Sequence, residues 1–372
     1  MIKILFLIHD LGQGGAEKVL VNLVNNMDPA RFDITVMALF GGGVNEQFLK
    51  PHIRFISCFG RAFPGNSHLM KLLTPRQLHR WLIRERYDVE VSYLEGPSAR
   101  IISGCPWEQT RLVSWIHVEQ HDMKKLAASF RSEKEARACY DRFDRTVCVS
   151  QYVKDDFCGI LNYRNPCCVL YNTVESDTIA ALALETADRL AHDGKLRLAA
   201  VGSLKESKGY LRLLRIVRRL CDEGYPLHLY ILGIGSLQAA MEQYIHENGL
   251  DTAVTLLGYD TNPYKYVSKC DLFVCASFAE GFSTTATEAL IVGTPVCTVE
   301  VSGMKEMLGE HNEYGIVTEN SEMGLYRGIK ALLDDPGLLD HYRQQALIRG
   351  RAFHTCETVA AVEKMLLEVW EK

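Results

Sequence analysis

Short apolar runs alternate with segments of helical period along the whole chain. In the first half, strands are expected at Ile2–Ile8, Phe32–Leu39, Val89–Tyr93, Arg111–Ile116 and Thr146–Val149. The pattern restarts in the second half, at Leu196–Val201, Leu227–Leu232, Val254–Leu257, Leu272–Cys275 and Val296–Val299. Near-continuous apolar strands separated by helices predict parallel sheets covered on both faces.

The segments between the strands predict amphipathic helices. They are expected at Ala16–Asn26, Leu69–Arg86, Ser176–His192 and Thr284–Val292, and a last helix carries Val359, Val362, Leu366 and Val369 on one stripe. The two series of strands meet near Asn172–Lys195. We therefore predict two doubly wound domains, residues 1–172 and 173–355, with the helix at 356–372 packing back on the first.

Composition narrows the class of protein. The chain has 372 residues, 47% hydrophobic and 23% charged, which is typical of a globular protein with two cores. A formal net charge of −5 argues against nucleic acid as a partner. The twelve cysteines include no Cys-x-x-Cys pair, so a reducing cytosol is expected and a metal site is not. No apolar run approaches the ~18 residues of a membrane span.

The turn Gly12-Gln13-Gly14-Gly15 follows the first strand and could cradle a phosphate at a helix start. A tight strand-to-helix turn with no ligand is the other interpretation. A dinucleotide fingerprint would need a glycine where Glu17 stands and an acid after the second strand, which ends at Phe40-Gly41. A nicotinamide enzyme is therefore disfavoured.

A second candidate lies between the strand at Leu272–Cys275 and the helix at Thr284–Val292. Glu280 precedes that helix and Glu288 falls in its first turns, so both carboxylates could face one pocket beside free backbone N–H groups. Such a pocket suits a sugar and a diphosphate. The alternative is a Thr285–Glu288 capping box with Glu280 merely solvated.

The segment from Glu280 to Glu288, followed by Gly293 and Pro295, resembles the signature of retaining glycosyltransferases of the GT-B fold. Further matches keep the same order along the chain: Gly14-Gly15-Ala16-Glu17, Ser150, Tyr171-Asn172, Val201-Gly202, Lys208-Gly209, Leu232-Gly233, Leu257-Gly258 and Glu300–Leu308. The likeness covers nearly the whole chain. It is strongest to family 4, especially bacterial enzymes of capsule, exopolysaccharide or lipopolysaccharide synthesis.

The resemblance implies two Rossmann-like domains facing each other across a cleft, a nucleotide diphosphate sugar as donor, most simply a UDP-sugar, and no obligatory metal. It implies that Glu280 contacts donor hydroxyls, that Glu288 binds the ribose and that Lys208 stabilises the leaving diphosphate. Backbone groups would hold the phosphates at Gly14, Gly15, Gly281, Phe282, Ser283, Thr284 and Thr285, and the base at Gly258 and Tyr259. His117 would lie beside the reacting sugar. A satisfied histidine and an ordinary surface lysine are the alternatives for His117 and Lys208.

One position departs from the family pattern. Ser203 stands where similar enzymes carry an arginine, five positions before the lysine, so the phosphate clamp lacks one cation. Lys205 could supply charge, but it lacks the planar fork that binds phosphate bidentately. The departure puts donor affinity in question.

The acceptor side is less defined by motifs. Arg76, His79, Arg80 and Arg84 recur at helical spacing beside Trp81, a pattern that could rest on an anionic membrane at the inner face of the cell. A solvated helix face is the alternative. The acceptor would be a glycan or a lipid-linked saccharide. Two rival functions stay open, a sugar-nucleotide epimerase of the same shape and a non-catalytic subunit that only binds sugar nucleotides.

Overall fold

The computed structural model describes residues 1–12, 14–61, 70–191 and 193–372. The chain divides into two compact units, one made of residues 1–174 and 355–372 and the other of residues 175–354. The division falls between Val174 and Glu175.

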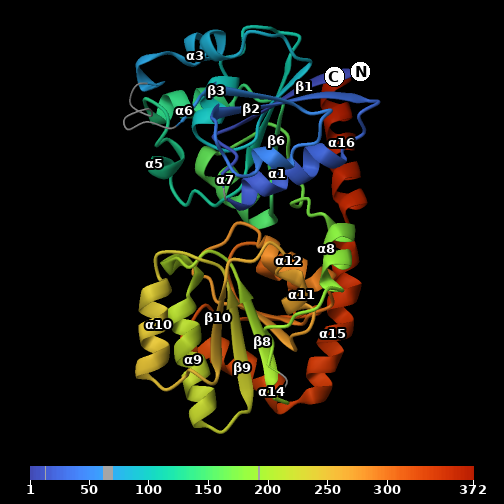
Figure 1. Ribbon diagram of the computed structural model, residues 1–372. Coiled ribbons are helices and arrows are strands. Elements are labelled where there is room, and N and C mark those ends of the chain that lie inside the picture. The colour runs from blue at the N-terminus through green and yellow to red at the C-terminus, as the bar shows by residue number, and fades with distance from the viewer. Residues whose placement is uncertain (13, 62–69, 192) are drawn as a thin grey trace. The chain divides into compact units, whose positions relative to one another are not determined.

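The described part of the first unit contains a seven-stranded parallel sheet in the order β3-β2-β1-β4-β5-β6-β7 (Figure 1). The strands are β1 (Ile2–Ile8), β2 (Phe32–Phe40), β3 (Arg54–Phe59), β4 (Val89–Ser92), β5 (Arg111–Ile116), β6 (Arg145–Cys148) and β7 (Cys167–Val169). Every strand pairs in parallel with its neighbours. The strand order reverses between β1 and β4, where ligands of doubly wound sheets bind.

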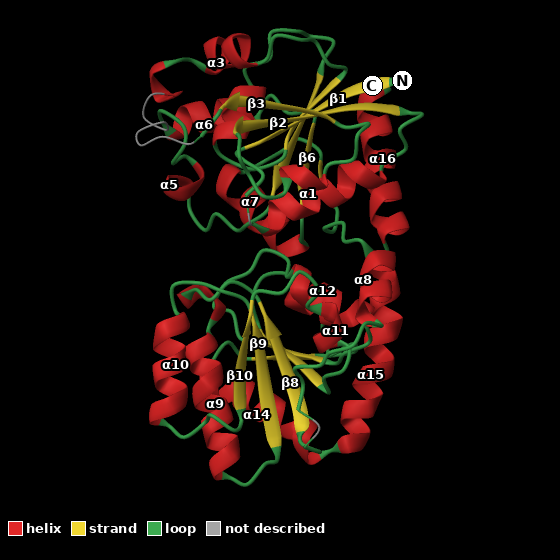
Figure 2. Ribbon diagram, in the orientation of Figure 1, coloured by secondary structure: helices red, strands yellow, loops and turns green. Residues whose placement is uncertain are grey.

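Helices cover both faces of this sheet (Figure 2). They are α1 (Gly15–Asn26), α3 (Pro75–Leu82), α4 (Pro97–Ile102), α5 (Met123–Leu126), α6 (Glu133–Tyr140), α7 (Gln151–Leu161) and α16 (Thr355–Trp370), with a 3-10 turn η1 (Glu46–Phe48). The last helix, α16, packs beside α1 within the same unit. A hydrogen bond of 2.7 Å from the Asp28 N–H to the Glu363 carboxylate ties the end of α1 to it.

Two expected helices are shorter than the sequence pattern indicates. Leu69 lies outside the described residues, and α3 begins only at Pro75, where Thr74 forms a capping box with Gln77. Proline lacks the N–H that a continuing helix needs, so it starts this helix and cannot lie inside one. The helix predicted over Ser176–His192 ends at Ala183, and His192 is likewise outside the described residues.

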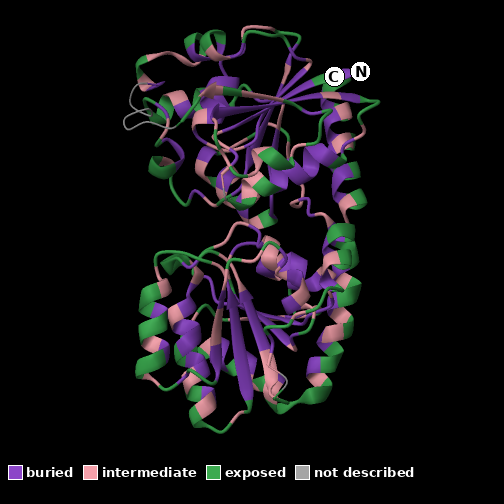
Figure 3. Ribbon diagram, viewed as in Figure 1, coloured by how far each residue is buried: buried purple, intermediate pink, exposed green. Residues whose placement is uncertain are grey.

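The described part of the second unit contains a six-stranded parallel sheet in the order β10-β9-β8-β11-β12-β13. The strands are β8 (Leu196–Val201), β9 (Leu227–Leu232), β10 (Val254–Gly258), β11 (Leu272–Cys275), β12 (Val296–Val299) and β13 (Ile316–Thr318). Its helices are α8 (Ser176–Ala183), α9 (Tyr210–Asp222), α10 (Gln238–Glu247), α11 (Tyr264–Val267), α12 (Thr284–Ile291), α13 (Met304–Leu308), α14 (Glu322–Asp334) and α15 (Pro336–Gly350), with 3-10 turns η2 (Glu206–Lys208) and η3 (Arg351–Phe353). The central strands are buried in both units (Figure 3).

The apolar pattern of the sequence did not predict three of the strands, namely β3, β7 and β13. Each lies at an edge of its sheet, where the residues are only partly buried. The edge strand β3 carries polar residues such as Arg54 and Ser57, whereas β7 and β13 span only three residues each, too few to show a pattern. The fourth edge strand, β10, was predicted from its apolar run.

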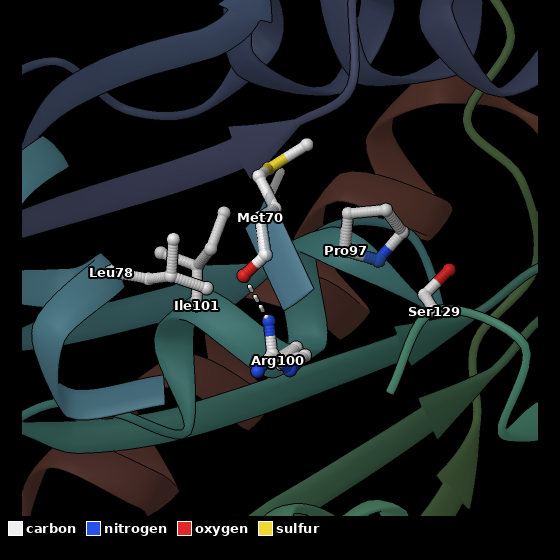
Figure 4. A pocket seen from close by; sticks show the side chains of 6 residues that line it. All are labelled: Met70, Leu78, Pro97, Arg100, Ile101 and Ser129. Carbon is white, nitrogen blue, oxygen red and sulfur yellow. Dashed lines mark hydrogen bonds between the residues drawn. The ribbon is translucent and has the colours of Figure 1, made fainter. Parts of the chain in front are cut away.

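Arg100 of α4 closes a small pocket in the first unit (Figure 4). The side chain is 1% exposed and donates to the carbonyl oxygens of Met70 at 2.8 Å and Leu73 at 2.6 Å. Its Nε also donates to the Glu135 carboxylate at 2.9 Å. A buried guanidinium with these partners fixes the chain before α3 against α4 and α6.

Candidate functional site

Lys208 and Glu280 form an ion pair at the carboxyl edge of the second sheet. Lys208 ends η2 after β8, Glu280 follows β11, and β8 and β11 are neighbours. The Lys208 ammonium lies 2.6 Å from Oε1 of Glu280, which also accepts a hydrogen bond of 2.5 Å from the Ser277 hydroxyl. The side chains are 29% and 11% exposed, so the charges are half-sheltered and still open to a solute.

The loops that carry this pair are fixed against each other. The Phe278 N–H donates to the Ser207 carbonyl at 2.7 Å. Arg212 of α9, 4% exposed, donates to the carbonyls of Ala276 and Ser277. The ammonium and the carboxylate therefore keep their places without a ligand, which is the preorganisation that electrostatic binding requires.

The helix α12 begins beside Glu280. Ser283 is its N-cap, and the hydroxyl accepts from the Ala286 N–H at 3.4 Å. The first-turn amides of a helix have no acceptor within it, and they carry partial positive charge. The alternative capping box of Thr285 with Glu288 is wrong, because Thr285 lies inside the helix and the cap is two residues earlier.

Glu288 has a different partner from Glu280. It is 8% exposed and accepts a hydrogen bond of 3.2 Å from the Tyr264 hydroxyl of α11. That both carboxylates serve one pocket stays a prediction, because Glu280 is held by Lys208 and Glu288 contacts Tyr264.

The other predicted residues of this unit lie at the same edge of the sheet. Gly233, after β9, packs so closely on Gly202 that a β carbon would come within 1.9 Å of the Gly202 oxygen. Its N–H donates to the Gly258 carbonyl at 2.8 Å. Ser203 and Tyr259 follow these glycines and are exposed, Tyr259 to 70%.

In the first unit, the glycine turn begins α1. Gly14 is the N-cap without a side-chain hydrogen bond, and the Gly12 N–H donates to the Asp10 carboxylate at 2.7 Å. A β carbon on Gly15 would meet no atom within 4 Å. The helix start is thus open in front of Gly15, while Gln13 lies outside the described residues.

His117 follows β5 at the carboxyl edge of the first sheet. It is 7% exposed, and burial lowers the pKa of its imidazole to about 3, so the ring is neutral. Among the described residues no group bonds to its Nε2, and the role of His117 beside a reacting sugar stays a prediction.

Four supporting residues were missed by sequence reasoning: Ser277, Arg212, Tyr264 and Glu95. Glu95 accepts from the His117 N–H at 3.1 Å, and burial raises the pKa of its carboxyl group. Only Ser277 lies within a motif segment. The others lie outside the motif segments, and no local signal marks them.

The expected basic helix is corrected in two respects. Arg76, Arg80 and Trp81 are exposed on α3, but His79 is fully buried and hydrogen-bonded to Glu90 at 2.8 Å. His79 therefore belongs to the core, and Arg84 lies beyond the end of the helix.

Comparison with known proteins identifies the family to which this chain belongs. The description "Glycosyl transferases group 1" matches residues 185–349, and "Glycosyltransferase Family 4" matches residues 13–178. N-acetylgalactosamine-N,N'-diacetylbacillosaminyl-diphospho-undecaprenol 4-alpha-N-acetylgalactosaminyltransferase of Campylobacter jejuni is 30% identical, over 99% of this chain and 100% of that enzyme. The chain belongs to glycosyltransferase family 4.

Solved structures agree with this family's fold. Anabaena Alr3699/HepE in complex with UDP has a TM-score of 0.78 at 19% identity and covers 99% of this chain and 100% of its own. A glycosyltransferase from Rickettsia africae reaches a TM-score of 0.80 at 14% identity, with coverages of 99% and 98%. The family 4 glycosyltransferase therefore has two Rossmann-like GT-B domains, as predicted. Membership of this family argues against the two rival functions, a sugar-nucleotide epimerase and a non-catalytic subunit.

Proposed function

We propose that this glycosyltransferase moves a sugar from a UDP-sugar to a hydroxyl of a lipid-linked saccharide during bacterial surface-glycan synthesis, with retention of configuration. The observation that carries the proposal is the Lys208–Glu280 pair of 2.6 Å beside the start of α12. The printed name of the Campylobacter relative specifies a diphospho-undecaprenol acceptor, and Alr3699/HepE was solved with UDP-glucose. Both support the substrate classes.

In this proposal the second unit holds the donor. The diphosphate binds the Lys208 ammonium and the backbone amides at the start of α12, from Phe282 to Thr285, because both supply positive charge. Glu280 accepts hydrogen bonds from sugar hydroxyls, oriented by Ser277. Glu288 accepts from the ribose.

The remaining positions complete the donor and acceptor sides. Main-chain groups at Gly258 and Tyr259 contact the base, and Ser203 lies beside the phosphates. The helix start at Gly14 and Gly15 offers its amides from the first unit. The neutral His117 donates or accepts one hydrogen bond beside the transferred sugar through the unpartnered Nε2.

Cleavage of the anomeric bond leaves negative charge on the diphosphate and positive charge on the sugar. Lys208 and the helix amides stabilise the leaving group, an effect worth about 3–4 kcal/mol per well-placed donor. In this proposal these positive charges stabilise the leaving diphosphate, and no metal is obligatory. The leaving phosphate oxygen then takes the proton of the incoming hydroxyl on the same face, which preserves the configuration.

The lipid-linked acceptor implies contact with a membrane surface. Within the described ranges, no helix combines the length and the apolar character that crossing a bilayer requires. Arg76, Arg80 and Trp81 of α3 are exposed together and suit an anionic lipid surface. Sedimentation with anionic liposomes at low salt tests this contact, and loss of binding in an Arg76→Glu/Arg80→Glu variant is expected.

The reaction itself is tested with a panel of nucleotide sugars. Release of nucleoside diphosphate is measured with and without a polyprenyl-diphosphate saccharide, and the anomeric configuration of the product is read by NMR. Glu280→Gln and Lys208→Ala should each reduce turnover by about 10²–10³-fold. Lys330→Ala is the matched control, because Lys330 also forms a 2.6 Å pair, with Asp334, on the surface of the same unit. An inverted product would refute retention, and full activity of Lys208→Ala would refute the proposed site.

A further inference from the structure

His79, Glu90 and Cys105 meet in the core of the first unit, away from the carboxyl edge of the sheet. They come from α3, from β4 and from the loop after α4. Nε2 of His79 lies 2.8 Å from Oε2 of Glu90, and the Cys105 sulfur lies 3.7 Å from Oε1 of Glu90. One ligand atom of each residue lies within 4.8 Å of those of the other two.

Imidazole, carboxylate and thiolate are the ligand types that Zn²⁺ takes in proteins. With metal–ligand distances of about 2.0–2.3 Å, tetrahedral geometry places neighbouring ligand atoms roughly 3.3–3.7 Å apart. The Cys105–Glu90 separation already has that value, and the His79–Glu90 pair must open by a few tenths of an ångström. The main-chain oxygen of Trp107 lies 3.9 Å from the Cys105 sulfur.

Charge balance favours a cation at this point. His79 and Glu90 are 0% exposed and Cys105 is 1% exposed, so negative charge on the Glu90 carboxylate must be balanced by the groups that contact it. One divalent ion with a carboxylate, a thiolate and a neutral imidazole sums to zero charge.

The surroundings orient the ligands. The Trp107 ring packs edge-on against the His79 imidazole, with centroids 5.3 Å apart. Arg142 donates to the Cys105 carbonyl at 2.9 Å and to the Ser103 carbonyl. A metal site needs this second layer of contacts to hold its ligands in place.

We propose that His79, Glu90 and Cys105 form a structural site for a divalent transition-metal ion of the zinc class. The site links α3 to the sheet and so fixes the helix that exposes Arg76, Arg80 and Trp81. The sequence shows no metal-ligand spacing because the three ligands come from three separate elements.

The test uses the full-length protein, purified without chelator from zinc-containing medium and, separately, from cobalt-containing minimal medium. Elemental analysis should find one metal ion per chain. The cobalt form should show a thiolate-to-cobalt charge-transfer band in the near ultraviolet. Prolonged chelation should lower the thermal midpoint, and added Zn²⁺ should restore it.

Cys105→Ser should lose the charge-transfer band, and its metal affinity should fall by about tenfold or more. Cys297→Ser is the matched control, because Cys297 is equally buried but lies in the second unit, and this variant should keep both. A wild-type protein without stoichiometric metal, or a cobalt form without the band, would overturn the proposal. These wild-type measurements decide the matter even if Cys105→Ser fails to fold, and a band that survives in a folded Cys105→Ser would overturn it too.

Discussion

The α carbon of Gly209 packs directly against the carbonyl oxygen of Ala276. A β carbon at Gly209 would lie 1.9 Å from that oxygen, and the backbone is left-handed there with φ of 67°. The contact joins the loop that carries Lys208 to the strand end that leads to Glu280. Glycine at this position therefore sets the distance between the two charged groups.

Gly209→Ala should separate the Lys208 and Glu280 loops. The left-handed backbone alone costs an alanine roughly 1–2 kcal/mol, and the clash with Ala276 adds to it. We expect a lower free energy of unfolding and a raised KM for the donor, measured by urea denaturation and steady-state kinetics.

Gly249→Ala distinguishes the cost of the left-handed backbone from the cost of the clash with Ala276. Gly249 has a similar φ of 64°, but a β carbon there would meet no atom within 4 Å. In this variant the free energy of unfolding should fall only by the cost of the left-handed backbone, and the KM for the donor should not change. Equal effects of the two substitutions on KM would contradict the role assigned to the Ala276 contact.

Glu288→Gln should weaken donor binding more than it slows turnover. A hydrogen bond to a charged acceptor contributes about 1.5–3 kcal/mol, so KM for the donor should rise roughly 10- to 150-fold. The proposed contact with the ribose is the same in the ground state and the transition state, so kcat should change little. Glu247→Gln, at an exposed position of α10, should leave both constants as they are. A large loss of kcat would place Glu288 nearer the reacting bond.

The central strands of both sheets could be predicted because strands buried on both faces leave long apolar runs. The edge strands β3, β7 and β13 could not, since β3 carries polar residues such as Arg54 and the other two have only three residues each. The motif segments indicated Lys208 and Glu280 as candidates, and the structure brings these two side chains into contact. Tyr264 and Arg212 left no signal, because their contacts with the motif loops depend on tertiary packing alone.

The burial of His117 makes stability depend on pH. Its pKa is lowered from 6.5 to about 3, so the unfolded chain binds the proton more readily than the folded one between these values. The resulting stabilisation is complete above about pH 6.5 and is lost as the pH falls toward 3, by up to about 1.4 kcal/mol per pH unit.

His117→Gln should flatten that part of the stability curve. Urea denaturation of wild type and variant from about pH 7.5 to about pH 4 isolates the contribution of this one side chain to the free energy of unfolding. His246→Gln serves as the control, because the His246 side chain is 85% exposed. Parallel curves for wild type and His117→Gln would show that the imidazole does not titrate with a lowered pKa.

Ser203→Arg should tighten UDP binding, because it restores a cation to the loop that carries Lys208. Ser203 and Lys205 are both exposed, so the gain resembles that of a surface ion pair, about 0.2–1 kcal/mol or up to roughly fivefold in affinity. An arginine fork can also bind two phosphate oxygens at once, which a lysine cannot. Calorimetric titration at low and at high salt measures the effect, which should shrink as salt screens the charge. Ser203→Gln adds comparable length without charge and should bind UDP as the wild type does. Equal affinities of the arginine and glutamine variants would mean that a side chain at position 203 does not reach the diphosphate.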